Sequence, residues 1–503
     1  MSSTPASPVP APGLFKSVAR SSAVYSLPFI LQRIASILML PVYTRFLTTA
    51  DYGIMDLLEQ TLAVIVLLFG VRIAAAIGYF YFQASSEQAR RTVVGTAVLG
   101  AAMIGLAGAV ITWPLAPLLS RLVFGSTNEV LYFHIALLTW PCGFAMEALY
   151  TLLRVQDRPV AYTVASAVRL VLMVIAILIL LVALRLRVAG ILYAGLIVGA
   201  ILTVGLSIAT FRNEWPVFEF RTLKPFLRYS MALGFGGLAG LVINFGDRFV
   251  LPHYRSLSEL GVYVLAYKIG MLMTFVYGSF DSYWSSQAYD IMKRADADWV
   301  FKRMLTYVVL GTSAAALGLT VAARPALRIL AAAPFQSAAV IAPVIVLAYY
   351  IRAIGDFLRT LFLVAGRPGY DAITYTISAG VCIIGYLLLI PPFGALGAAW
   401  ATVLAFSVVT LISAVWTYRI RRYGVEWARV AKIGAAGAVG LLPWLLFSTS
   451  SLAAQLAMEG VSMALFVAVL WILRFASAGE LEYVRRFLCA PLRRLGFAGR
   501  ALR

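Results

Sequence analysis

The chain has 503 residues, of which 62% are hydrophobic and only 12% are charged, and its formal net charge is +20. Soluble domains carry charged residues at roughly a quarter of their positions, so this composition excludes a large soluble domain. Apolar stretches long enough to cross a bilayer, about 20 residues each, recur from end to end. The sequence therefore predicts an all-α polytopic membrane protein.

The predicted elements begin after a Pro-, Ser- and Ala-rich stretch over residues 1–20, which we interpret as a flexible, uncleaved tail. About fourteen predicted transmembrane helices follow, and a basic tail over 477–503 ends the chain. The predicted spans lie at residues 21–46, 52–80, 92–114, 130–153, 162–184, 189–211, 225–250, 261–288, 304–322, 338–363, 372–390, 394–417, 429–449 and 458–475.

Arginines occur inside several of these spans. A charged side chain at bilayer depth costs on the order of 2.5–3.5 kcal/mol on insertion scales, so each must face something more polar than lipid. We interpret this pattern as the path of an anion. The arginines are Arg33, Arg72, Arg169, Arg248 and Arg352.

Charge is distributed unequally between the two ends of the spans. Lys and Arg in short loops favour the cytoplasmic side. The basic loops, and both termini with them, are therefore predicted to be cytoplasmic in a bacterial inner membrane, which requires an even number of spans. The net charge then reflects topology, and nucleic acid is not an expected partner. The side with fewer basic residues has only Arg45, Arg121, Arg185, Arg187, Arg255, Arg324 and Arg328.

The sequence repeats itself at a period of about 208 residues. Residues 50–53 (ADYG) match 258–261 (SELG), and residues 155–159 (VQDRP) match 364–368 (VAGRP). Six crossings separate equivalent points, so the two copies enter the membrane from the same side. This parallel duplication predicts a lobe at 21–212, a second at 213–424 and two additional helices at 425–476. Paired lobes around a central cavity are typical of alternating-access transporters, although duplication retained only for folding is an alternative.

The first loop resembles a family signature: it reads Pro41-Val42-Tyr43-Thr44-Arg45-Phe46-Leu47, followed by Asp51-Tyr52-Gly53. The pattern is similar to that of the Wzx-like polysaccharide-biosynthesis flippases of the multidrug/oligosaccharidyl-lipid/polysaccharide exporter superfamily. The resemblance covers residues 15–475 and implies two six-helix lobes around a V-shaped cavity with two extra C-terminal helices. It also implies transport of undecaprenyl-diphosphate-linked oligosaccharide across the inner membrane, with membrane lipid and polysaccharide assembly proteins as further partners.

A polar stripe on the first span suggests where a diphosphate binds. Its members recur at steps of three and four residues and so share one helical face. Arg33 lies near mid-depth, and its planar guanidinium suits phosphate oxygens. Arg72 and Arg248 are further candidates. Pairing with carbonyls or acids is the alternative, and for Arg248 the alternatives are neutralisation by the adjacent Asp247 or snorkelling towards the outer face. The stripe contains Ser22, Ser26, Phe29, Arg33 and Ser36, with Ser26 a candidate glycan contact.

The eighth predicted span carries a second stripe at helical spacing. Aromatic rings can stack against sugars while hydroxyl groups bind their polar atoms, so Tyr267, Thr274 and Tyr277 are candidate glycan contacts. Ordinary helix packing is the alternative. Asp281 continues the same face.

Six acids also fall inside the predicted spans: Asp56, Glu59, Glu147, Asp247, Asp281 and Asp356. Arg352 and Arg359 are within helical reach of Asp356, so structural ion pairing is expected there. A partly desolvated carboxylate can also exchange a proton or bind a cation. Asp281 and Asp247 are our candidates for coupling transport to H⁺ or Na⁺.

Catalysis finds little support in the sequence, and we expect neither an enzyme nor a cofactor. Only His134 and His253 are present, so a multi-histidine metal site cannot form, and the three cysteines are expected to be packing residues. Two other functions stay open. A multidrug or cation exporter of the same superfamily would favour an acidic cavity, and a membrane glycosyltransferase, polymerase or ligase would need a large outward loop.

Overall fold

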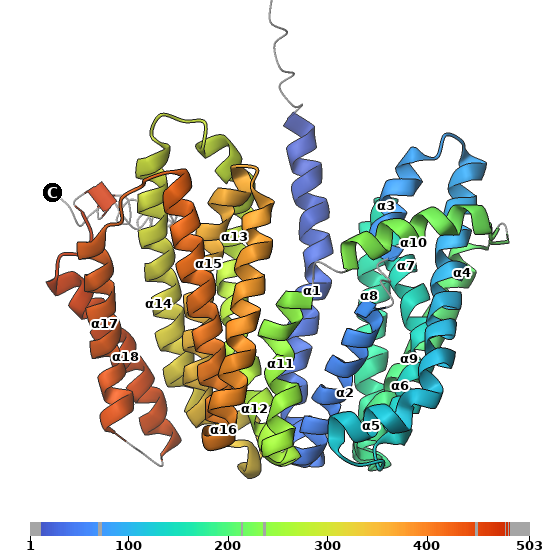
Figure 1. Ribbon diagram of the computed structural model, residues 1–503, viewed down its shortest axis with the longest axis horizontal. Coiled ribbons are helices and arrows are strands. Elements are labelled where there is room, and N and C mark those ends of the chain that lie inside the picture. Colours follow the sequence, from blue (N-terminus) through green and yellow to red (C-terminus); the bar gives the residue numbers. More distant parts are fainter. Residues whose placement is uncertain are drawn as a thin grey trace, which may run out of the picture. The chain divides into compact units, whose positions relative to one another are not determined.

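The computed structural model describes residues 12–68, 73–212, 215–234, 238–447, 451–477, 479–480 and 482. All regular elements in these ranges are helical (Figure 1). Ten helices within the described ranges are long and apolar enough to cross a membrane. This confirms the predicted all-α polytopic class, while the number of about fourteen spans stays a prediction.

The exposed side chains of these helices are apolar, as they are in a protein whose solvent is lipid. The helix α8 (Pro159–Ile177) shows the pattern clearly. Val160, Val164, Val168, Val171 and Ile175 recur at intervals of three or four residues along it and are all exposed. A soluble helix would present polar residues on this face, so the exposed stripe indicates contact with acyl chains.

The chain divides into two compact units. Unit 1 comprises residues 1–264, 330–335 and 386–395, and unit 2 comprises the remainder. The lobes predicted from the repeat have different boundaries, and they stay a prediction. Unit 1 contains α1 (Pro12–Phe46), α2 (Thr49–Leu68), α3 (Ile73–Gln83), α4 (Glu87–Thr112), η1 (Trp113–Leu115), α5 (Ala116–Phe124), α6 (Val130–Leu138), α7 (Trp140–Val155), α8, η2 (Leu178–Ala183), α9 (Arg187–Thr210), α10 (Phe220–Gly234), α11 (Leu238–Tyr254), the first half of α12 (Leu257–Gly270) and η4 (Ala333–Phe335).

Unit 2 is built around a cluster of aromatic side chains. The ring of Trp284 stacks on Phe357 with centroids 5.1 Å apart and meets Phe301 edge-on at 5.0 Å. All three are buried. The helices of this unit are the second half of α12, α13 (Met273–Ile291), α14 (Ala297–Leu330), α15 (Ala338–Val364), α16 (Pro368–Ile420), α17 (Trp427–Leu446) and α18 (Leu452–Ile472). The middle of α16, residues 386–395, belongs to unit 1.

Small residues let helices of unit 1 approach closely. The helices α4 and α7 pack together and bury Ala97, Ala101, Ala145 and Ala148 in one cluster. Small side chains are the usual means of close helix packing in a membrane, where no hydrophobic effect drives association. At one end of this unit Arg187 fastens α9 to α2, because its Nη2 lies 2.8 Å from a carboxylate oxygen of Asp51.

The two repeats meet at equivalent glycines. A Cβ atom on Gly53 of α2 would lie 2.4 Å from the carbonyl oxygen of Leu257, and one on Gly261 of α12 would lie 1.8 Å from that of Thr49. Each glycine faces the residue four positions before its counterpart, so the contact is reciprocal. The matching sequence segments therefore form a local two-fold crossing of α2 and α12.

The long helix α16 is interrupted at Gly394, whose backbone has φ 56° and ψ −132°. A side chain is strained at such a positive φ, and glycine is not. Arg255 donates to the carbonyl oxygens of Pro391 and Pro392 at 3.1 Å each, and Glu259 accepts from the amide of Ala395 at 2.7 Å. These hydrogen bonds give partners to backbone groups next to the interruption of α16. The interruption lies at the boundary between the predicted spans 372–390 and 394–417.

The segment predicted as a single span over 225–250 is divided between α10 and α11. The physical reason is that residues 220–228 alternate basic and apolar side chains at helical spacing. Leu223 and Phe226 are buried in unit 1, whereas Lys224 and Arg228 are exposed. An amphipathic helix of this kind packs against protein on one face rather than crossing the membrane.

Candidate functional site

Two exposed arginines lie on adjacent helices of unit 1. The helix α1 runs along both α8 and η2. Arg33 of α1 and Arg169 of α8 are exposed, and no carboxylate of the described residues forms an ion pair with Arg169. The structure thus presents two guanidinium groups on helices whose other exposed residues are largely apolar.

The two guanidinium groups also lie at a similar depth. Arg33 lies 13 residues before the end of α1 at Phe46, and Arg169 lies 14 residues before the end of η2 at Ala183. The Asp51–Arg187 ion pair places these two helix ends side by side. A rise of about 1.5 Å per residue puts both arginines about 20 Å from that end, near the middle of a membrane span.

Glu147 belongs to the same layer. It lies 8 residues before the end of α7 at Val155, and Arg169 lies 10 residues after the start of α8 at Pro159. The Glu147 side chain is exposed and forms no hydrogen bond or ion pair within the described ranges. We call Arg33, Glu147 and Arg169 the charged layer of unit 1. Their approximate depth could be read from the sequence, but their exposure could not.

Arg248 has a different environment. Its side chain is buried, and its Nε lies 2.7 Å from a carboxylate oxygen of Asp56 on α2. The guanidinium also donates to the carbonyl oxygen of Asn244 at 3.1 Å and lies over the ring of Phe245. Its burial and its ion pair with Asp56 favour the structural alternative for Arg248 over binding of a diphosphate.

Asp247 contacts its neighbour Arg248 through the backbone of that residue. Its carboxylate accepts from the backbone N–H of Arg248 at 2.8 Å and from the Tyr263 hydroxyl at 2.5 Å. Asp247 is fully buried, and its carboxylate is satisfied by protein groups.

The aromatic stripe predicted for glycan binding is largely buried. Tyr267 has no exposed surface and meets Tyr349 edge-on at 5.7 Å. Tyr277 belongs to the aromatic core of unit 2, and its hydroxyl donates to Asp281 at 3.2 Å. The hydroxyl of Thr274 donates to the carbonyl oxygen of Met271 at 2.6 Å. This environment favours helix packing for the stripe.

The stripe is also divided between two helices. The helix α12 ends at Gly270 and α13 begins at Met273, so the helical register that relates Tyr267 to Tyr277 is not continuous. Asp281 is half-buried on α13. It remains the more accessible of the two acids predicted to couple transport to an ion.

Two of the predicted residues are not placed. Arg72 lies outside the described residues, and the side chain of Ser26 lies outside the described part of α1. Their predicted contacts with the diphosphate and the glycan stay predictions.

In unit 2, charged residues of the predicted spans form ion pairs with one another. Arg359 lies 2.7 Å from Asp356 and 2.6 Å from Asp371, and Arg352 lies 3.4 Å from Asp356. The ion pairing predicted for Asp356 is therefore confirmed. Asp371, at the start of α16, is a member of this network that sequence spacing did not identify.

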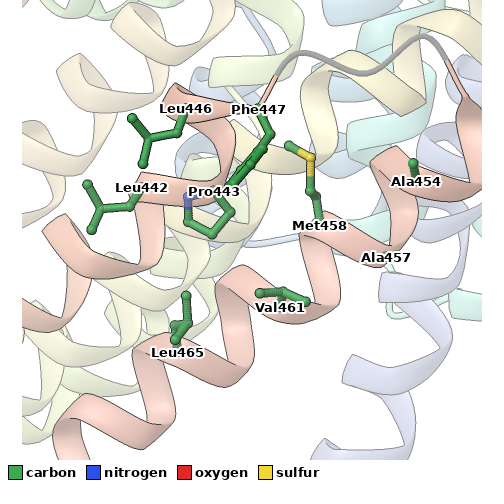
Figure 2. Close-up of a pocket in the computed structure, with 9 residues that line it drawn as sticks. All are labelled: Leu442, Pro443, Leu446, Phe447, Ala454, Ala457, Met458, Val461 and Leu465. Carbon is green, nitrogen blue, oxygen red and sulfur yellow. The ribbon is translucent and has the colours of Figure 1, made fainter.

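An apolar groove lies between α17 and α18 (Figure 2). Its volume is about 540 Å³, and all of its lining residues are apolar. Such a lining suits a hydrocarbon chain and offers nothing to a phosphate. The lining residues are Leu442, Pro443, Leu446, Phe447, Ala454, Ala457, Met458, Val461 and Leu465.

No group of three or more His, Cys, Asp or Glu in the described ranges could hold a metal ion. The two described cysteines, Cys142 and Cys382, are free thiols.

Comparison with solved structures relates the fold to transporters. The inward closed conformation of the lipid II flippase MurJ matches with a TM-score of 0.69 at 15% identity, covering 89% of this chain and 99% of that one. An inward-facing multidrug resistance MATE family transporter of the MOP superfamily matches with a TM-score of 0.61 at 15% identity, covering 80% and 98%. A MOP superfamily transporter from Pyrococcus furiosus matches with a TM-score of 0.54 at 14% identity, covering 81% and 95%.

No curated protein sequence matches the chain. A family model described as "Polysaccharide biosynthesis protein" matches residues 18–282, which is more than half of the chain. That match includes the first-loop signature and the whole charged layer of unit 1. The chain therefore belongs to the polysaccharide biosynthesis protein family, within the fold of the MOP superfamily transporters.

Proposed function

We propose that this protein is a flippase that moves a polyprenyl-diphosphate-linked oligosaccharide across the bacterial inner membrane by alternating access. The translocated oligosaccharide would then be used to assemble a surface polysaccharide such as O-antigen, capsule or exopolysaccharide. Family membership and the likeness to a lipid II flippase support this proposal. The observation that carries it is the pair of exposed arginines, Arg33 and Arg169, near mid-span in unit 1.

Chemistry connects these arginines with a diphosphate. A guanidinium offers a planar fork of N–H donors that matches phosphate oxygens, and charge-assisted hydrogen bonds of this kind are among the strong ones. In the proposed mechanism Arg33 and Arg169 hold the diphosphate, with Arg72 as a further candidate. The lipid tail stays in an apolar environment, and no covalent bond changes.

The test follows a fluorescent polyprenyl-diphosphate-linked glycan across vesicles that contain only the purified protein. Loss of a charge-assisted hydrogen bond lowers binding about ten- to a hundredfold, so Arg33→Ala and Arg169→Ala should each reduce transport by that order. Arg33→Lys should retain part of the activity because it keeps the charge without the fork. Arg121→Ala removes an exposed arginine at a helix end and is the matched control.

Two results would contradict the proposal. Full transport by the Arg33→Ala and Arg169→Ala variants would remove these residues from the diphosphate site. Absence of glycolipid movement with the parent protein, under conditions in which it is folded, would remove the flippase function itself.

A MATE-like exporter of cations is the second candidate. Its support is the fold likeness to multidrug transporters and the exposed, unpaired carboxylate of Glu147. The same vesicles loaded with a fluorescent organic cation distinguish the two functions. Efflux of the cation that depends on Glu147, without glycolipid movement, would favour the exporter.

We also propose Asp281 and Asp247 as candidates for coupling to H⁺ or Na⁺, with Asp281 the stronger because it is half-buried rather than enclosed. The variants Asp281→Asn and Asp247→Asn keep the size of each side chain and remove its charge. If transport by these variants responds to pH and sodium gradients as the parent does, the two residues have no part in coupling.

A further inference from the structure

The segment that joins α9 to α11 presents an unusual surface. Trp215 is 90% exposed and Phe220 is 71% exposed, although both are large aromatic residues. Arg221, Lys224 and Arg228 follow at steps of three and four residues, so they share one face of α10, and all three are exposed. We call these five residues the α10 surface.

This segment is held firmly against the rest of unit 1. Phe226 is fully buried and stacks on Phe80 of α3 with centroids 4.5 Å apart. Leu223 fills the space beside Gly100 of α4, where a Cβ atom would lie 2.7 Å from its Cδ1. Figure 1 shows α10 running across the direction of α4 and α7. The fixed buried face determines which side chains point outward.

The backbone before α10 is fixed in the same way. The amide of Glu219 donates to the Thr96 hydroxyl at 3.0 Å. Gly95 allows α4 to approach this linker, because a Cβ atom there would lie 2.4 Å from the carbonyl oxygen of Val217. Trp215 and Phe220 are thus carried at the surface by an anchored segment.

The contacts on α4 also set the depth of this surface. The first turns of α4 carry Glu87, Arg90 and Arg91, and the helix has no charged residue from Val93 onwards. The α10 segment contacts Gly95 to Gly100, immediately beyond this change. That is the level of the membrane interface, where tryptophan rings and the charged ends of Lys and Arg are typically found.

No carboxylate in the described part of the chain forms an ion pair with Arg221, Lys224 or Arg228. An unpaired cationic stripe flanked by exposed aromatic rings, at interfacial depth, matches negatively charged lipid. The geometry points to the α10 surface as a binding site for anionic phospholipid headgroups, with Trp215 and Phe220 inserted beside the acyl chains. The site is separate from the charged layer and does not depend on which cargo is transported.

The test uses the full-length protein in vesicles of phosphatidylcholine with brominated phosphatidylglycerol or, in a parallel set, brominated phosphatidylcholine. Bromine quenches tryptophan fluorescence on contact, and subtraction of the Trp215→Phe variant isolates the signal of Trp215. We expect stronger quenching by the brominated anionic lipid at equal mole fraction. Each Lys or Arg near an anionic membrane surface contributes about 1 kcal/mol of attraction. Neutralising one of these residues should therefore lower the preference for the anionic lipid about fivefold.

The triple variant Arg221→Gln, Lys224→Gln, Arg228→Gln should therefore lose the preference and keep its quenching by brominated phosphatidylcholine. It leaves Leu223 and Phe226 unchanged, so it should fold. The control variant Lys293→Gln, Arg294→Gln, Arg419→Gln removes the same charge from other elements and should keep the preference.

Native mass spectrometry of bound phosphatidylglycerol gives a second measurement that does not depend on tryptophan fluorescence. A triple variant that retains the lipid preference would overturn the inference. A Trp215 signal that neither lipid quenches would also overturn it, because the segment would then face water and suit a soluble acidic partner instead.

Discussion

The arginines of the predicted spans differ in what surrounds their guanidinium groups. Arg248 is buried against Asp56 at 2.7 Å, and Arg359 is held by Asp356 and Asp371. Arg169 is exposed on a helix of apolar residues. The first two satisfy their charge within the protein, which costs desolvation but needs no ligand. The third has a guanidinium available to an anion from outside the fold.

This difference yields a prediction for Arg248. Removing one partner of a buried ion pair leaves the other charge uncompensated, at a cost of about 3–5 kcal/mol. Arg248→Met should therefore lower the melting temperature of the purified protein in detergent. The double variant Arg248→Met, Asp56→Leu should recover part of the loss because it leaves no buried charge unpaired.

Arg121→Met is the control, since its side chain is exposed at the end of α5. The Arg121→Met variant should have the same melting temperature as the parent protein. If Arg248→Met melts normally but no longer transports the glycolipid, the guanidinium serves the cargo rather than the fold, and the structural interpretation is wrong.

Sequence spacing located the charged residues but could assign only those partners that lie on the same helix. Arg352, Arg359 and Asp356 are close along one helix, so their pairing was predictable. Asp56 and Arg248 are far apart in the chain and meet only because α2 and α11 pack together. The burial of Tyr267 against Tyr349 likewise depends on a tertiary contact. A helical periodicity identifies a face but not what covers it.

At the scale of elements, the crossing of α2 and α12 depends on two glycines. A methyl group at Gly53 or Gly261 would overlap backbone atoms of the other helix. Overpacking of this kind costs about 1–3 kcal/mol. Gly53→Ala and Gly261→Ala should each lower the melting temperature and reduce accumulation in membranes.

Gly205→Ala on α9 provides the comparison, since a Cβ atom there would meet nothing within 4 Å. Alanine favours a helix over glycine by about 1 kcal/mol, so this variant should be neutral or slightly stabilised. Equal stability of all three variants would show that the crossing can open without penalty.

The segment after α18 is held to α14 and α17 by the contacts of Glu480. Glu480 lies 2.6 Å from Arg429 of α17 and 2.8 Å from Arg303 of α14, and it also accepts from the Tyr307 hydroxyl. Partial burial by itself would raise the pKa of this carboxyl. The hydrogen bonds from Tyr307, the Ser477 backbone and Arg429 outweigh burial and lower its pKa to about 2.

The depressed pKa of Glu480 predicts how this contact depends on pH. Its stabilising contribution is complete above the ordinary value of 4.5 and is lost as the pH falls towards about 2. Amide hydrogen exchange at residues 475–477, corrected for intrinsic rates, should show constant protection between about pH 8 and pH 5 and a decline below that range.

Glu480→Gln should release the same amides at neutral pH, because the amide side chain cannot pair with Arg303 and Arg429. Asp290→Asn is the control, since its pair with Lys293 is long, at 3.7 Å, and exposed. Unchanged protection in the Glu480→Gln variant would show that apolar packing alone holds the segment.

The element boundaries were predictable where residue type enforces them. Pro391, Pro392 and Gly394 mark the interruption of α16 in the sequence itself. The division of 225–250 was harder to predict, because glycines inside an apolar stretch suggest close packing or a bend equally well. Only the burial of Leu223 and Phe226 shows that the first part is an amphipathic helix on the protein surface.

At the scale of the whole molecule, the distribution of Lys and Arg makes a prediction about orientation. The loop between α7 and α8 carries Arg158, and the segment between α16 and α17 carries Arg421 and Arg422. The loop between α5 and α6 has neither Lys nor Arg over residues 125–129. Because positive loops remain in the cytoplasm, the first two should be cytoplasmic and the third should face outward.

Single cysteines can test this orientation in a background of Cys142→Ala, Cys382→Ala and Cys489→Ala. An impermeant maleimide added to spheroplasts should label Asn128→Cys directly. It should label Arg158→Cys and Arg422→Cys only after the membrane is permeabilised. All three positions are exposed, so poor access to the thiol should not limit the reaction. The reversed pattern would place the basic loops outside and would contradict a flippase that collects its cargo in the cytoplasm.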